Sequence, residues 1–167
     1  VFILCKLNKN HINKFSFLKS CQSFNFRDAL YNLKIKNTNI LSAGYSLYKW
    51  QNYNTFCGSC GSKNKLDDDG NSLICSNKSC KKKIFPSAYP TIIVNIVHKN
   101  KILLARNPKW EKKLYSCIAG FCEQNESAEE TVRREVYEEV GLRLEKIIYK
   151  YSQYWPLTNN LMLGFEA

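Results

Sequence analysis

The stretch from Gly120 to Gly141 constrains the fold more than any other part of this 167-residue chain. Within it, Ser127 is a favoured N-cap residue, and Glu130 three positions later completes a capping box. Gly141 stands where a helix commonly ends in the left-handed conformation. Between these signals, an apolar row at helical spacing can face a core; it consists of Val132, Val136 and Val140. The sequence therefore predicts an amphipathic helix over residues 128–140.

Three glutamates lie on one side of this predicted helix. Glu135, Glu138 and Glu139 are related by i+3 and i+4 spacing, so their side chains project together. Carboxylates this close repel one another unless cations lie between them, and their hard oxygens suit Mg²⁺ or Mn²⁺. The alternative is a solvated acidic face balanced by Arg133 and Arg134.

Charge is distributed unevenly along the chain. Residues 1–56 carry a net charge of +7 and residues 57–119 a net charge of +8, whereas residues 120–167 carry −4. A basic body around an acidic patch suits a polyanionic substrate held next to a carboxylate-bound metal. A lysine-rich solvated surface is the other explanation.

Four cysteines form two short pairs. Cys57 and Cys60 are separated by two residues, Cys75 and Cys80 by four, and fourteen residues lie between the pairs. This spacing is typical of a tetrahedral Cys₄ zinc site in a reducing compartment, and because four thiolates fill the shell, the Zn²⁺ would be structural. Lysines crowd the second pair, which leaves open a nucleic-acid-binding ribbon or a solvated face; they are Lys78, Lys81, Lys82 and Lys83.

The remaining pattern predicts an α+β chain in three parts. Residues 1–56 form an N-terminal region with a helix near 40–53, residues 57–86 the cysteine module with a hairpin tip at 67–71, and residues 87–167 a mixed domain. Strands are expected within this last part; their predicted ranges are 91–97, 101–105, 114–119, 144–151 and 161–166. The first two are expected to form a hairpin.

The spacing of glycines, glutamates and Arg-Glu between Gly120 and Leu142 resembles the box of the Nudix hydrolases at every fixed position. The resemblance implies a mixed-sheet α/β/α sandwich and metal-assisted water attack on phosphorus. It also implies roles by position. Glu135 and Glu139 would bind the metal, and Glu138 would be a further ligand or a base. Glu126 would support the site, Arg134 would orient a glutamate, and Ala119 would offer its carbonyl to the metal.

A cysteine ribbon directly before such a box resembles the NADH pyrophosphatase subfamily. That subfamily carries the stretch S-Q-P-W-P-F-P-x-S, and residues 152–160 here read SQYWPLTNN. The resemblance implies cleavage of NAD(H) to NMN(H) and AMP. Related enzymes remove NAD caps from RNA, and many are dimers. The implied substrate-binding residues are Phe85, Gln153, Tyr154, Trp155, Pro156, Leu157, Thr158, Asn159 and Asn160. For Trp155, core packing is the alternative.

Two other functions remain open from the sequence. One is hydrolysis of other nucleoside diphosphate derivatives, such as ADP-ribose or dinucleoside polyphosphates. The other is a zinc-ribbon and Nudix binding module without turnover. No apolar run approaches the length of a membrane span. The cysteine usage predicts an intracellular protein, either cytoplasmic or, because residues 1–27 contain no acid, organellar.

The chain stops directly after the last predicted strand, where the family continues with further strands. We therefore expect a C-terminally incomplete domain that is poorly stable or weakly active. Equal turnover by this chain and by one extended at its C-terminus would contradict that expectation.

Overall fold

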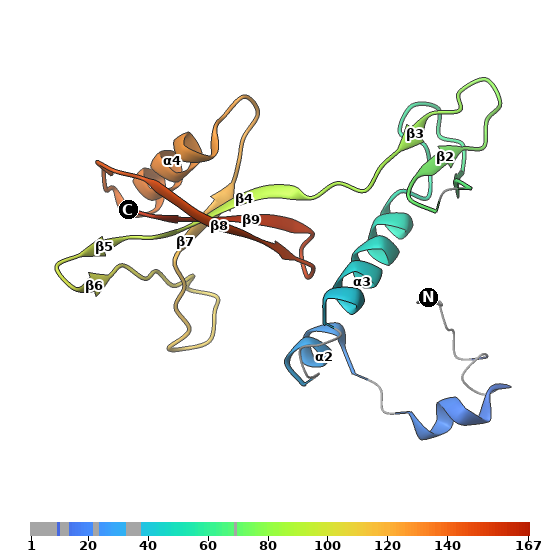
Figure 1. Ribbon diagram of the computed structural model, residues 1–167, viewed down its shortest axis with the longest axis horizontal. Helices are drawn as coiled ribbons and strands as arrows, with labels where there is room; N and C mark the ends of the chain where they lie inside the picture. Colours follow the sequence, from blue (N-terminus) through green and yellow to red (C-terminus); the bar gives the residue numbers. More distant parts are fainter. Residues whose placement is uncertain (1–9, 11–13, 22–23, 33–37, 69) are drawn as a thin grey trace. The chain divides into compact units, whose positions relative to one another are not determined.

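The computed structural model describes residues 10, 14–21, 24–32, 38–68 and 70–167. The chain divides into two compact units, residues 1–86 and 87–167 (Figure 1). Part of the acid-free segment 1–27 lies outside the described residues. In the described part, no helix combines the length and the apolar character needed to cross a bilayer.

Helices make up the described N-terminal part of the first unit. They are η1 (Ser16–Ser20), α2 (Phe26–Asn32) and α3 (Thr38–Tyr53). Helix α3 contains the helix predicted for 40–53 and begins two residues earlier. Trp50 is its buried residue, with 7% of its surface exposed. Phe26 of α2 stacks on Tyr45 of α3 with ring centroids 3.7 Å apart, which joins the two helices.

A small antiparallel sheet follows α3. It consists of β1 (Asn64–Leu66), β2 (Leu73–Cys75) and β3 (Lys83–Ile84), in that order. The turn between β1 and β2 coincides with the predicted hairpin tip. The Gly70 N–H donates to the Asp67 carbonyl at 2.9 Å, and Gly70 has a φ of +71°, which costs glycine little.

The second unit contains a four-stranded mixed sheet in the order β7-β4-β9-β8. These strands are β4 (Tyr89–Asn95), β7 (Ile118–Phe121), β8 (Ile148–Trp155) and β9 (Asn160–Glu166). Strand β4 pairs antiparallel with β7 and parallel with β9, and β8 forms an antiparallel hairpin with β9. A separate two-stranded hairpin joins β5 (Val97–His98) to β6 (Lys101–Ile102).

Helix α4 (Ala128–Val140) packs on the sheet, and its bounds are those predicted. Ser127 accepts a hydrogen bond from the Glu130 N–H, the reciprocal bond is also present, and Gly141 ends the helix with a φ of +68°. Two of the three predicted valines are completely buried. The core they join consists of Ile92, Val94, Ile96, Ile118, Val132, Val136 and Phe165. The α+β class and the mixed sheet are therefore confirmed.

Several predicted strand boundaries were wrong. The strand predicted at 144–151 begins only at Ile148, because Leu144 and Ile147 pack against the core from a loop. The strand predicted at 114–119 is shifted to Ile118–Phe121, which is the segment opposite Thr91–Val94 of β4. The strand predicted at 91–97 ends at Asn95, so the hairpin expected for 91–105 shrinks to β5 and β6. Contacts with other elements of the folded chain decide where each strand begins and ends. An apolar run in the sequence does not specify those contacts.

Candidate active site and cysteine cluster

Arg134 is the centre of the site on α4. Its Nε and Nη2 donate to the two carboxylate oxygens of Glu126 at 2.8 and 2.9 Å. Its Nη1 donates to Glu135 at 2.8 Å and to Glu138 at 3.2 Å, while Nη2 also donates to the Phe121 carbonyl at 3.0 Å. One guanidinium therefore joins three of the predicted box glutamates to β7.

The Glu126 carboxylate is the most strongly held of these acids. Besides Arg134, the Glu123 N–H donates to it at 3.0 Å and the Thr131 hydroxyl at 2.8 Å. These donors, Arg134 first, lower the pKa of Glu126 to about 2. The same contacts raise the pKa of the Arg134 guanidinium. Glu126 thus stays ionised and holds Arg134 in place.

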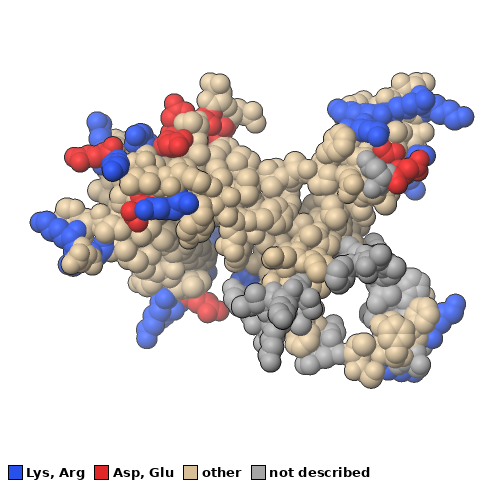
Figure 2. Space-filling view, viewed as in Figure 1, with Lys and Arg blue, Asp and Glu red and all other residues tan. Residues whose placement is uncertain are grey.

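Glu135 points back toward strand β7. A Cβ atom on Gly120 would lie 2.0 Å from the Glu135 Cδ, so only glycine leaves room for this carboxylate. Ala119, whose carbonyl is the candidate metal contact, is the preceding residue of β7. Burial and the neighbouring Glu135 charge raise the pKa of Glu139. Figure 2 shows acidic side chains gathered over α4.

Replacing Gly120 by alanine is expected to lower activity while leaving the stability of the fold nearly unchanged. The new Cβ displaces only the flexible end of Glu135, so the unfolding midpoint should change little. Displacing a carboxylate of the site should lower metal-dependent activity about 10- to 100-fold. Parallel thermal unfolding and turnover measurements test this. The control is Gly58→Ala, because a Cβ at Gly58 meets nothing within 4 Å. Full activity of Gly120→Ala would contradict the prediction.

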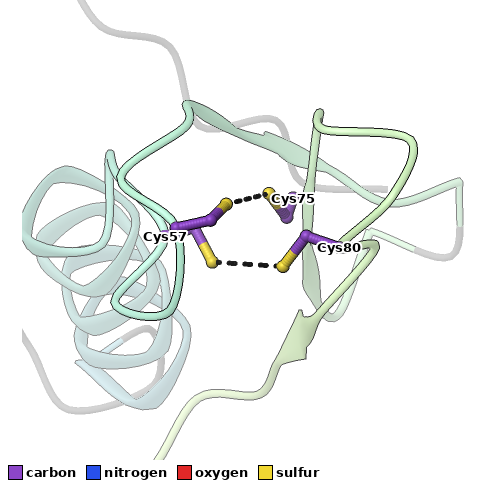
Figure 3. A group of neighbouring side chains, drawn as sticks. Cys57, Cys75 and Cys80 are labelled. Atoms are coloured by element: carbon purple, nitrogen blue, oxygen red, sulfur yellow. Dashed lines mark hydrogen bonds between the residues drawn. The ribbon is translucent and has the colours of Figure 1, made fainter.

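The four paired cysteines converge in the first unit. Their sulfur atoms all lie within 4.8 Å of one another. The Cys57 and Cys80 Sγ atoms are 3.9 Å apart (Figure 3). Those of Cys60 and Cys75 are 3.5 Å apart. A tetrahedron of sulfurs around Zn²⁺ has edges of roughly 3.8 Å, given Zn–S bonds of ~2.3 Å. The cluster therefore has the size of a tetrahedral thiolate site.

The thiols of this cluster differ in acidity. Backbone and hydroxyl donors of Ser62 lower the pKa of Cys60 to about 6, and backbone donors lower that of Cys57. Burial raises the pKa of Cys75 to about 12. A cation at the centre favours the thiolate form of every ligand and so offsets the burial of Cys75.

The predicted substrate stretch forms the end of β8 and the turn into β9. Tyr154 and Trp155 leave 36% and 38% of their surfaces exposed, and Trp155 is not a member of the core. Pro156 is buried, Leu157 is half-buried and Thr158 is exposed in the turn, whereas Gln153 is exposed on β8. Phe85 belongs to the other unit and is 60% exposed.

The two asparagines of this stretch hold the turn together. The Tyr154 hydroxyl donates to the Asn159 side chain, whose Nδ2 donates to the Ser87 carbonyl at 2.7 Å. Asn160 is buried, and its Nδ2 donates to the Thr91 hydroxyl at 2.7 Å. Tyr154, which replaces a proline of the subfamily stretch, thus ties the end of β8 to the turn.

The structure assembles only part of the predicted constellation. Arg134 forms ion pairs with Glu126, Glu135 and Glu138. Among the described residues, however, only the paired cysteines form a group of three or more candidate metal ligands whose ligand atoms all lie within 4.8 Å of one another. Sequence reasoning missed Thr131, which is completely buried and donates to Glu126. The sequence feature that could have indicated Thr131 is a hydroxyl residue directly before Val132, the first valine of the apolar row of α4.

Comparison with known proteins adds to this geometry. A family model described as the NUDIX domain matches residues 88–166. The chain is 39% identical over 149 residues to the NAD-capped RNA hydrolase NudC of Mannheimia succiniciproducens, covering 86% of this chain and 55% of that protein. It is 36% identical over 142 residues to the human mitochondrial NAD(P)H pyrophosphatase NUDT13, covering 84% of this chain and 40% of that protein.

Two further similarities agree. Nudix hydrolase 19, chloroplastic, of Arabidopsis thaliana is 39% identical over 129 residues, covering 73% of this chain and 30% of that protein. The chain thus spans about half, or less, of the length of these curated relatives. A NUDIX hydrolase structure from Nitrosomonas europaea has a TM-score of 0.51 at 22% identity, covering 67% of this chain and 65% of that chain, and shares its fold. Residues 88–166 are therefore a NUDIX domain.

Proposed function

We propose that this protein hydrolyses the diphosphate linkage of NAD(H), giving NMN(H) and AMP, and removes NAD caps from RNA. The observation that carries the proposal is the guanidinium of Arg134, which holds Glu126, Glu135 and Glu138 beside β7. The names of the relatives, an NAD-capped RNA hydrolase and an NAD(P)H pyrophosphatase, supply the substrate class.

The carboxylates fit a hard divalent cation. Gly120 leaves space that the Glu135 carboxylate fills, and this places hard oxygens next to the backbone of Ala119. Glu135, Glu139 and the Ala119 carbonyl are the proposed ligands of Mg²⁺ or Mn²⁺, with Glu138 a further ligand or a base. Bound there, the cation would polarise the diphosphate and lower the pKa of the attacking water.

The chain's own residues then have separate tasks. Arg134 keeps Glu135 and Glu138 oriented on one side of α4. Glu126 in turn fixes Arg134 through two hydrogen bonds. Burial and the neighbouring Glu135 charge raise the pKa of Glu139, and a bound cation would favour its ionised, ligating form.

Residues around the β8–β9 turn are the proposed substrate contacts. The partly exposed rings of Tyr154 and Trp155 can stack on a base or on nicotinamide, and Gln153 offers an exposed amide. Asn159 and Asn160 shape the turn through Ser87 and Thr91. The other proposed substrate contacts are Pro156, Leu157 and Thr158 of the same stretch, together with Phe85.

For the first unit we propose a Cys₄ zinc ribbon over residues 57–86, after an N-terminal region at 1–56 and before the Nudix domain at 87–167. The convergence of Cys57, Cys60, Cys75 and Cys80 supports Zn²⁺ as its structural ion. Because the four sulfurs complete the tetrahedron, this ion would leave no position for water.

One assay tests the hydrolase. The protein is incubated with NADH, NAD⁺, ADP-ribose or NAD-capped RNA in the presence of Mg²⁺ or Mn²⁺, and released AMP is measured. We expect metal-dependent release from NADH, NAD⁺ or NAD-capped RNA, and its loss in Glu139→Gln. Glu129→Gln is the matched control, because Glu129 is an exposed glutamate of α4 outside the proposed site. No release from any substrate would refute the hydrolase, and release from ADP-ribose alone would refute the NAD(H) specificity.

A further inference from the structure

A concave surface lies along α4, beside the segment that follows the helix. It is a groove of about 510 Å³ between Glu130, Arg133, Arg134 and Tyr137 of the helix and the segment 142–144 that follows it. Its volume is in the range of small-molecule sites. The residues belong to the same unit as the box glutamates, so their relative positions are defined by one fold.

Two arginines of the groove are available for an anion. Among the described residues, neither Arg133 nor Arg143 has a carboxylate within ion-pair distance. Arg133 reaches only the Leu144 carbonyl, at 3.5 Å. The acidic residue of the groove is Glu130. Its carboxylate accepts hydrogen bonds from the Ser127 N–H and hydroxyl at 2.8 and 2.7 Å, and these bonds form part of the N-terminal cap of α4.

An aromatic ring of the groove lies beside Arg143. Tyr137 is 55% exposed, and the Arg143 guanidinium carbon lies 5.8 Å from its ring centroid. An exposed ring next to guanidinium groups is the combination that binds single-stranded nucleic acid, where bases stack and phosphates pair with cations. A phosphate alone would not require the ring, and an apolar ligand would not require the arginines.

Arg134 belongs both to the groove and to the proposed active site. This side chain lines the groove and at the same time donates to Glu135 and Glu138. A polymer attached to a substrate at the glutamates can therefore pass Arg134 and enter the groove. A small substrate such as NADH has no such extension.

We propose that this groove binds the nucleotide units that follow an NAD cap, with phosphates against Arg133 and Arg143 and a base on Tyr137. The inference rests on the proposed cap-removing function. It assigns to α4 two sides with different tasks: the carboxylates face the diphosphate, and the arginine groove selects substrates that carry an RNA chain.

Steady-state kinetics with two substrates test the groove. In Arg133→Ala/Arg143→Ala and in Tyr137→Ala, the KM for NAD-capped RNA should rise about tenfold relative to the KM for NADH, because a phosphate or a stacking contact is lost. Lys146→Ala is the matched control, since Lys146 is an exposed cation of the same loop that does not line the groove. An unchanged KM ratio in both variants would overturn the proposal.

Direct binding separates this inference from the hydrolase itself. Fluorescence anisotropy with an uncapped single-stranded RNA oligonucleotide needs no turnover. A plot of the logarithm of the binding constant against the logarithm of salt concentration has a negative slope. Loss of two phosphate contacts should make this slope shallower by about 1.4. RNA binding that weakens in the double variant supports the groove even if no substrate is hydrolysed. Equal binding by wild type and double variant, or binding of AMP as tight as that of the oligonucleotide, would overturn it. Circular dichroism verifies that each variant is folded.

Discussion

Chelation of the Zn²⁺ proposed for the cysteine cluster is expected to unfold residues 57–86. The sheet there has strands of only three, three and two residues, and much of its buried side-chain material consists of Cys57, Leu73 and Cys75. So small a core cannot offset the entropy of ordering the chain, and ion binding then supplies the folding free energy. The backbone amides of Cys57, Gly61 and Cys75 donate hydrogen bonds in the folded structure. Without the ion, these amide hydrogens would exchange freely with solvent.

Hydrogen exchange with and without a chelator measures this effect. We expect protection of these three amides to fall on the order of a thousandfold, while the strands of the second unit keep theirs. Cys75→Ser should reproduce the loss in the presence of zinc. Cys21→Ser is the control, since Cys21 is exposed and outside the cluster. Unchanged protection after complete removal of zinc would show that the ribbon folds without a metal.

Arg134→Ala is expected to cause the second large effect, on stability and activity together. The substitution removes the guanidinium that pairs with Glu126, Glu135 and Glu138. Glu126, with only 14% of its side chain exposed, would then be a charge without its cation. We expect a loss of about 2 kcal/mol in unfolding free energy, less than for a fully buried pair because Arg134 is 22% exposed. Activity should fall at least about 100-fold.

Two further variants separate the causes. Arg134→Lys keeps the charge but cannot make the paired bonds to Glu126 and the bond to the Phe121 carbonyl, so it should remain largely inactive. The double variant Arg134→Met/Glu126→Gln removes the uncompensated charge, and it should regain most of the stability without regaining activity. Denaturant unfolding and AMP release are the measurements. Recovery of activity in the double variant would mean that Arg134 acts through stability alone.

Local signals in the sequence were sufficient for helix α4 and for the cysteine cluster. The capping box at Ser127 and the left-handed Gly141 act within one or two turns of chain, so neighbouring residues alone set the ends of the helix. The short spacing within each cysteine pair similarly forms each half of the cluster. The sequence also placed Glu135 and Glu138 on one side of α4, since helical periodicity determines that arrangement.

Only the tertiary structure decided how these parts meet. The strand ends at Asn95 and Ile118 depend on which backbone lies opposite, and no single segment contains that information. Burial of Thr131, the fit of Glu135 against Gly120, and the groove beside Arg143 all arise where α4 packs on β7 or on the segment after it. The sequence by itself determined which charged groups α4 presents. Tertiary packing decided what each of them contacts, because those partners come from other elements whose positions only the folded chain defines.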